Sequence, residues 1–177
     1  SVVDDENADI RTVSSGCSYT VAKILGEKME PGGVVFISVV GNDALGLAAT
    51  CSLEKAGVDV SAVKVMDGST PIGVEIHNII GDLEFCRENN ALMEAVSPQY
   101  IDDCEDVLAK ADGIFIDGTL SVETLNYISD KYSGKCKIFF DPASVLGGVR
   151  FAESKISCFC VMPGRMEAEA MTGLQIL

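Results

Sequence analysis

Positive charge is scarce in this sequence. Lys and Arg together number 13 against 27 Asp and Glu, which gives a formal net charge of -14 over 177 residues. Such a chain repels a polyanion unless a local basic pocket or a metal ion intervenes. We therefore expect no nucleic-acid partner.

Long hydrophobic runs are also missing. The longest apolar stretches, such as residues 33–40, span fewer than ten residues, whereas a membrane-spanning helix needs about 20. The opening residues 1–9, SVVDDENAD, have neither the positive nor the apolar region of a signal peptide. We expect a soluble, cytoplasmic protein without a membrane partner.

Metal-site spacing is absent as well. The seven cysteines are scattered, no C-x-x-C pair occurs, and His77 is the single histidine, so a structural zinc site is not expected. Cys158 and Cys160 form a C-x-C on an apolar stretch. We interpret the cysteines as reduced core thiols of a cytosolic protein, and His77 as a surface or rim residue.

What the sequence does have is apolar residues in an alternating pattern. Hydrophobic residues make up 47%, enough for one sizeable core. Strand-like runs are expected at 34–40, 58–65, 113–117, 137–142 and 158–162, and helices at 45–56, 99–110, 121–132, 143–156 and 166–172. This β-α alternation predicts an α/β fold with a doubly wound, mostly parallel sheet flanked by helices.

Residues 70–86 follow a different pattern. Apolar and polar residues alternate from Thr70 to His77, and an apolar run returns at 79–85. Two strands with a turn near Gly81 and Asp82 make a hairpin with one polar face. We expect a small β lid that stands apart from the main sheet.

Ligands bind beyond the carboxyl ends of the strands in parallel sheets, so the residues that follow the strands are candidates. They are residues 41–43, 117–119, 141–142 and 163–165. Structural roles compete with binding at several positions. Ser18 or Thr20 would serve as a helix N-cap, as would Asp43, and Glu167 would complement a helix dipole.

Taken together and in order, these stretches resemble the ribokinase-like PfkB carbohydrate kinase family, and within it the pseudouridine kinase branch. The similar stretches are residues 7–22, 39–46, 57–61, 70–85, 117–121, 141–144 and 163–173. Residues 39–46 resemble V-G-x-D-x-x-G, residues 141–144 resemble the D-P-V-S of the pseudouridine kinases, and residues 163–173 resemble P-N-x-x-E-A-E-x-x-T-G. The resemblance covers nearly the whole chain.

The resemblance implies transfer of the ATP γ-phosphoryl group to the hydroxymethyl group of a sugar or nucleoside, with pseudouridine favoured, and a role for Mg²⁺. It places Gly16, Thr20 and Thr119 in the sugar pocket, with Ile72 or Val74 of the lid closing over it. Glu167 would bind Mg²⁺ through water. A homodimer through the lid is a further expectation.

The chain departs from the family pattern at several points. No G-A-G-D occurs, so no catalytic base is assigned within residues 1–177. Thr20, Thr119 and Gly164 replace family asparagines, and a threonine hydroxyl cannot present an amide's separate donor and acceptor. We interpret residues 1–177 as a partial kinase domain that lacks the nucleotide-binding half and is inactive alone.

Two alternatives remain open. The lost asparagines fit a degenerate member that binds a nucleoside or a partner chain without catalysis. A kinase module fused to a glycosidase is the other, because some members of the branch resembled here are joined in that way.

Overall fold

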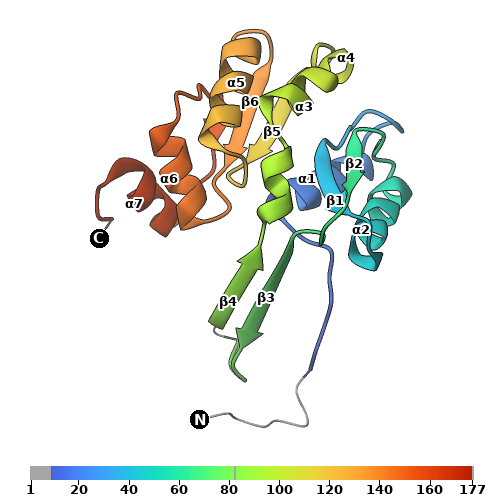
Figure 1. Ribbon diagram of the computed structural model, residues 1–177. Helices are drawn as coiled ribbons and strands as arrows, with labels where there is room; N and C mark the ends of the chain where they lie inside the picture. Colours follow the sequence, from blue (N-terminus) through green and yellow to red (C-terminus); the bar gives the residue numbers. More distant parts are fainter. Residues whose placement is uncertain (1–8, 82, 177) are drawn as a thin grey trace.

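The computed structural model describes residues 9–81 and 83–176, so Asn7, Ala8 and Asp82 of the motifs above lie outside the described residues (Figure 1). The elements in order are α1 (Cys17–Gly26), β1 (Ser38–Gly41), α2 (Ala44–Lys55), β2 (Val63–Met66), β3 (Ile72–His77), β4 (Leu83–Asn89), the 3₁₀ helix η1 (Ala91–Ala95), α3 (Pro98–Asp103), α4 (Glu105–Leu108), β5 (Gly113–Asp117), α5 (Val122–Tyr132), β6 (Lys137–Asp141), α6 (Val145–Glu153), β7 (Cys160–Val161) and α7 (Arg165–Thr172).

The strands of the body run parallel, as the alternation predicts. β1 pairs with β2, and β5, β6 and β7 pair in that order, all in parallel register. The parallel strands form a two-stranded and a three-stranded sheet rather than one continuous sheet. Val39 of β1 nevertheless belongs to the same buried cluster as Ile116 and Phe140, so both sheets share one core.

That core includes side chains of α5 and β6, and Phe151 of α6 packs against it. Phe140 and Leu125 are fully buried, and Phe151 of α6 lies 5.0 Å from Phe140, measured between ring centroids. Leu125 lies on the buried face of α5, the helix that begins after Ser121, whose side chain accepts a hydrogen bond from the Thr124 amide. The buried Thr124 hydroxyl then donates to the Val96 carbonyl and ties α5 to the segment before α3.

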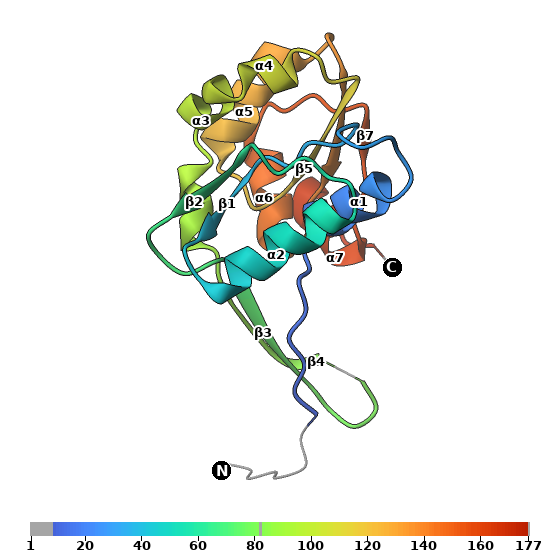
Figure 2. The same ribbon diagram turned by 90° about the vertical axis from the view of Figure 1, so that its right-hand side faces the viewer.

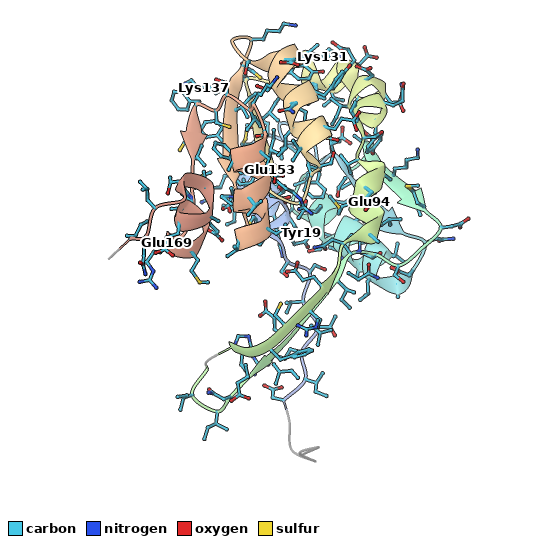
Figure 3. All side chains as sticks on the ribbon, turned by 60° about the vertical axis from the view of Figure 1, so that its left-hand side comes forward. Tyr19, Glu94, Lys131, Lys137, Glu153 and Glu169 are labelled. Carbon is cyan, nitrogen blue, oxygen red and sulfur yellow. The ribbon has the colours of Figure 1, made fainter. Side chains whose placement is uncertain are left out.

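Polar contacts hold the helices together away from the lid. Lys131 of α5 reaches Asp102, with 2.5 Å between Nζ and Oδ1, and also pairs with Glu105. Tyr127 donates to the same Asp102 carboxylate. Figure 3 shows Lys131 at the end of the body opposite the lid hairpin. This network joins α5 to α3 and α4.

A smaller second core lies between α1 and α2. It contains Tyr19, Leu53 and Val58, and the Tyr19 ring meets Phe36 edge-on at 6.5 Å between centroids. Among the described residues the buried Tyr19 hydroxyl is without a hydrogen-bond partner. The Tyr19 ring is therefore positioned by its apolar packing.

Several expected elements are shorter or broken. Regular pairing starts only at Ser38, because residues 34–36 instead meet Asp59 through backbone hydrogen bonds and an isolated bridge. The expected helix at 99–110 is interrupted at Cys104, whose φ of -98° and ψ of 13° are not helical. The expected strand at 158–162 narrows to β7, with two residues.

The glycine pair of α6 explains how that helix fits. From the sequence alone, Gly147 and Gly148 weaken a helix. In the structure, a Cβ on Gly147 would lie 1.9 Å from the Pro142 carbonyl oxygen, and one on Gly148 would lie 2.9 Å from the Glu167 carbonyl oxygen. The pair therefore lets α6 approach the β6 end and α7 closely.

The lid stands apart, as predicted. β3 and β4 pair antiparallel with a register shift at Ile76 and His77, and Figures 1 and 2 both show the hairpin projecting from the body. The expected return strand at 79–85 is wrong at its start. The turn begins at Asn78, whose side chain accepts a hydrogen bond from the Ile80 amide. β4 follows it and extends to Asn89.

The cysteines, the possible membrane-spanning helices and His77 can also be compared with expectation. All seven cysteines are free thiols, but only Cys104 is buried, so the expectation of core thiols is wrong for the other six. Across residues 9–81 and 83–176, none of the helices has the length and apolarity needed to cross a membrane. His77 is exposed on the lid, where its ring contacts Glu75 and the Gly81 carbonyl, as the expectation of a surface histidine required.

Gly147→Ala tests the close approach of α6. The new methyl group would overlap the Pro142 carbonyl oxygen, so we expect a loss of roughly 1–3 kcal/mol in the free energy of unfolding. Gly73→Ala is the matched control, because its Cβ meets nothing closer than 3.7 Å. Urea titration measures both. Equal stability of the two variants would contradict the packing described.

Candidate functional site

A cavity of about 400 Å³ opens where α1 begins beside the end of β6. It is lined by Gly16, Cys17, Thr20, Val21 and Asp141. Gly16, with a φ of 118°, is the N-cap of α1, and no side chain caps this helix. The expectation of Ser18 or Thr20 as cap is therefore wrong. Gly16 and Thr20 both line the cavity, and their role in binding stays a prediction.

Two carboxylates meet at this edge of the sheet. Asp117 and Asp141 are register partners at the ends of β5 and β6, and neighbouring strands lie about 4.8 Å apart. Asp117 accepts from the Thr119 amide at 3.1 Å, and Asp141 accepts from the Ala143 amide at 2.8 Å. Each carboxylate is thus fixed by the turn that follows its strand.

These carboxylates act on Cys17. Burial, followed by the charges of Asp141 and Asp117 and a hydrogen bond to Asp141, raises the pKa of the Cys17 thiol to about 11. The Glu167 charge acts in the same direction. The thiol is therefore protonated at neutral pH. Sequence reasoning missed Cys17 and Val21, although both lie beside Gly16 and Thr20 on the first turns of α1.

Thr119 is placed differently from expectation. Its hydroxyl donates to Asp117 at 2.5 Å, and its carbonyl oxygen and that of Gly118 accept from Arg150 of α6. Thr119 is not among the residues that line the cavity. Its hydroxyl is committed to orienting Asp117, which itself stands beside Asp141.

The lid residues Ile72 and Val74 also lie away from the cavity lining. Their side chains are 40% and 51% exposed, and they share one face of β3. In this structure the lid extends away from the body. The fold brings Gly16 and Thr20 together with Asp141, and leaves Ile72 and Val74 apart from them.

Glu167 has a structural contact of its own. It is the third residue of α7, and its carboxylate accepts from the Gly164 amide at the helix start, which is the capping role weighed above. Among the described residues, no group of three or more His, Cys, Asp or Glu side chains converges as a metal site. Carboxylate oxygens suit Mg²⁺ chemically, and contact between Glu167 and Mg²⁺ through water stays a prediction.

Asp43 joins the body to the lid. Asp43 caps α2 by accepting from the Gly46 amide at 2.8 Å, and it also accepts from the Thr70 amide at 2.8 Å and the Thr70 hydroxyl at 2.6 Å. Thr70 in turn accepts from the Gly41 amide. These hydrogen bonds, led by the Thr70 hydroxyl, lower the pKa of Asp43 to about 2. The capping role of Asp43 is confirmed, and the partner Thr70 was missed.

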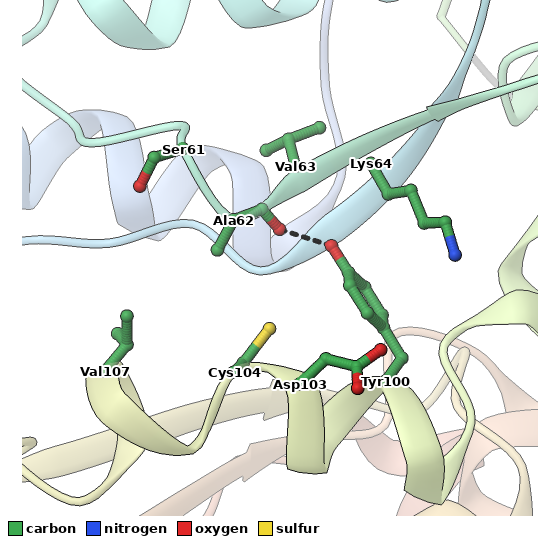
Figure 4. Close-up of a pocket in the computed structure, with 8 residues that line it drawn as sticks. All are labelled: Ser61, Ala62, Val63, Lys64, Tyr100, Asp103, Cys104 and Val107. Atoms are coloured by element: carbon green, nitrogen blue, oxygen red, sulfur yellow. Dashed lines mark hydrogen bonds between the residues drawn. The ribbon is translucent and has the colours of Figure 1, made fainter.

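A second cavity of about 350 Å³ lies between β2 and the α3–α4 segment. Figure 4 shows its lining, which includes Lys64, Tyr100 and Cys104. The Tyr100 hydroxyl donates to the Ala62 carbonyl at 2.5 Å. Burial raises the pKa of Tyr100 to about 12, so the hydroxyl remains a donor. This hydrogen bond joins α3 to the segment before β2. We therefore assign Tyr100 a structural role and not a catalytic one.

Comparison with known proteins rests on structure. No protein-family model matches the sequence, and no curated protein matches it either. A carbohydrate kinase from Agrobacterium tumefaciens superposes with a TM-score of 0.72 at 18% identity, over 98% of this chain and 58% of that one. The fold is ribokinase-like.

Other solved structures agree. The ribokinase from Giardia lamblia has a TM-score of 0.72 at 17% identity and covers 98% of this chain and 55% of its own. The 2-dehydro-3-deoxygluconokinase from Thermotoga maritima has a TM-score of 0.70 at 16% identity, over 96% and 56%. The chain therefore spans somewhat more than half the length of these kinases. The predicted fold class is confirmed.

Asp43→Asn tests the tie between body and lid. The folded-state pKa of about 2 lies below the ordinary value of 3.8, so the stabilisation by the carboxylate is complete only above about pH 5 and is lost as the pH falls through 4 to about 2 and below. We expect the variant to be less stable than the parent at pH 7 and to lose less stability between pH 4 and pH 2. Thermal melts across this range measure the effect. An exposed control, Asp130→Asn on α5, should keep the parental pH profile.

Ala143→Gly tests the turn that fixes Asp141. Ala143 has a φ of 61°, a left-handed conformation that costs a residue with a Cβ about 1–2 kcal/mol. We expect the glycine variant to be as stable as the parent or more stable by up to about 1 kcal/mol. Ala48→Gly, on the exposed face of α2, should instead lose roughly 0.5–1 kcal/mol. A loss of equal size at both sites in urea titrations would overturn the strain assignment.

Proposed function

We propose that the protein containing this chain transfers the γ-phosphoryl group of ATP to a hydroxyl group of a sugar or nucleoside. The observation that carries the proposal is the cavity at the strand ends, lined by Gly16, Thr20 and Asp141, in a ribokinase-like fold whose structural neighbours are named as carbohydrate kinases. An Escherichia coli neighbour solved with ATP and Mg²⁺ supports these two as cofactors.

In this proposal α1 supplies the acceptor site. Gly16 permits close approach of the sugar to the backbone, and the Thr20 hydroxyl donates to or accepts from a sugar hydroxyl. Thr119 acts through Asp117, whose carboxylate it holds. When bound, Mg²⁺ would neutralise phosphate charge, and Glu167 would reach it through water. The base that deprotonates the acceptor is not assigned within these 177 residues, because they contain no G-A-G-D.

The lid completes the proposed site. Ile72 and Val74, together with Ile76 and Phe85, make one apolar face of the hairpin, and each of the four is 40–52% exposed. Closure of the hairpin over the cavity would bring part of this face onto the sugar and exclude water. We also propose that the hairpin contributes to a homodimer and that the protein acts in the cytoplasm on a small-molecule substrate.

Pseudouridine is the acceptor we favour. The argument is the turn Asp141-Pro142-Ala143-Ser144, which resembles D-P-V-S of the pseudouridine kinases and whose first residue, Asp141, lines the cavity. The acceptor atom would be the 5′-hydroxyl oxygen of the ribose.

A second function is favoured by one observation. The Thr119 hydroxyl is used within the protein by Asp117, at a position where the family resembled here has an asparagine. A site with fewer ligand donors and no G-A-G-D fits a protein that binds a nucleoside without transferring phosphate.

The deciding experiment uses the natural protein that contains this chain, with radiolabelled ATP, Mg²⁺ and a panel of pseudouridine, uridine and D-ribose. Phosphorylation of pseudouridine, with Thr20→Val at least about tenfold slower through loss of a ligand hydrogen bond, is the expected result. Calorimetric binding without turnover would favour the second function. Neither binding nor turnover with any member of the panel would overturn both.

A further inference from the structure

The turn that follows β5 is held from two sides. The Gly118 amide donates to the Asp141 carbonyl at 2.8 Å, which ties the turn to the end of β6. From α6, one guanidinium nitrogen of Arg150 donates to the Gly118 carbonyl at 2.8 Å and to the Thr119 carbonyl at 3.4 Å. Gly118 is buried and Arg150 is half-buried. The backbone of the turn is therefore fixed at one amide group and two carbonyl groups.

The close packing of α6 brings Arg150 to this turn. Arg150 lies in the last turn of α6, three positions after Gly147, so the two residues share a face of the helix. A Cβ on Gly118 would lie 2.7 Å from the Gly147 Cα. Because the helix meets the turn through its backbone at Gly147, the Arg150 side chain reaches the carbonyl groups beside it.

The fixed turn determines where Asp117 stands. The amide and the hydroxyl of Thr119 both donate to Oδ1 of Asp117, at 3.1 Å and 2.5 Å. A rotation of the Thr119 backbone would carry both donors away from that oxygen. Asp117 is the register partner of Asp141, which lines the cavity. Arg150 is therefore connected to the wall of the cavity through Thr119 and Asp117.

From these contacts we infer that Arg150 is a positioning residue for the acceptor site. Its guanidinium holds the carbonyl groups of residues 118 and 119, so that Thr119 keeps Asp117 in place beside Asp141. The inference rests on the proposed function, because it concerns the acceptor site of that reaction. Without the donor, two carbonyl groups would lose a charged hydrogen-bond partner and the turn would open more often. A tie that served stability alone would leave acceptor binding by the folded protein unchanged.

Hydrogen exchange in the natural protein measures the positioning without any substrate. Arg150→Met removes the donor and keeps an unbranched apolar stem. We expect the amides of Gly118 and Thr119 to exchange at least about threefold faster in this variant, while peptides from β1 keep the parental rates. Lys135→Met, at an exposed position before β6, controls for the loss of a cation and should change neither. Unchanged exchange at the turn overturns the inference whether or not the protein is a kinase.

Kinetics with the natural protein test the consequence for the acceptor. For the member of the panel that is phosphorylated, Arg150→Met should raise the KM of the acceptor about fivefold or more and leave the KM of ATP within about twofold of the parental value. Lys135→Met should keep both constants. Partial unfolding would lower kcat and leave both KM values as they are. An unchanged acceptor KM, or an equal rise in both KM values, overturns the inference and leaves phosphoryl transfer intact.

Two further variants keep the test decisive. Arg150→Lys retains a cationic donor, although without the guanidinium fork, and should show smaller changes in exchange and acceptor KM than Arg150→Met. Changes as large as those of Arg150→Met count against a role for the donor. Arg150→Gln, which is neutral and shorter, replaces Arg150→Met if that variant does not fold, and parental behaviour of Arg150→Gln overturns the inference.

Calorimetry covers a natural protein that binds without turnover. In that case Arg150→Met should weaken acceptor binding about fivefold or more, and this result supports the inference while it removes the transfer step. Equal affinity of parent and variant overturns the inference. If the parent binds no member of the panel, the proposed acceptor site and the inference fall together.

Discussion

The contact among Gly118, Pro142 and Gly147 sets the geometry of the strand ends. A Cβ on Gly118 would lie 2.2 Å from the Pro142 carbonyl oxygen, and one on Gly147 would lie 1.9 Å from it. Because no side chain intervenes, the turns after β5 and β6 and the first turn of α6 touch through their backbones. Asp117 and Asp141 are held as neighbours by this contact, and the cavity at α1 depends on where they stand.

The lid depends on a different constraint. One carboxylate, Asp43, caps α2 and also binds the amide and the hydroxyl of Thr70, and the close approach of Gly41 to residues 68–70 leaves no space for a side chain there. The base of the hairpin is therefore fixed, while β3 is exposed along its whole length. A hairpin with a fixed base and exposed strands would suit the proposed closure over a bound ligand.

Features that depend on a few neighbouring residues could be predicted from the sequence. The cap at Asp43 is confirmed, as is the parallel fold class, because cap residues and strand periodicity act over a few positions. Contacts between distant segments were not predictable from such patterns. The role of Gly147, for example, depends on the Pro142 carbonyl oxygen, which comes from another turn. The Thr119 hydroxyl, which the resemblance implies for the sugar pocket, donates instead to Asp117 in the structure.

The cavity joins two kinds of structure that differ in how readily they accept substitution. On one side of the cavity, Asp141 lies at the end of β6, where the following turn is in close backbone contact with Gly118 and Gly147. Most replacements at these contacts would disturb the body. Its other wall, Cys17, Thr20 and Val21, lies on consecutive turns of one helix that begins without a side-chain cap. Descendants of such a protein could therefore acquire new ligand preferences by changing three positions on a single helix, with the scaffold beneath left as it was.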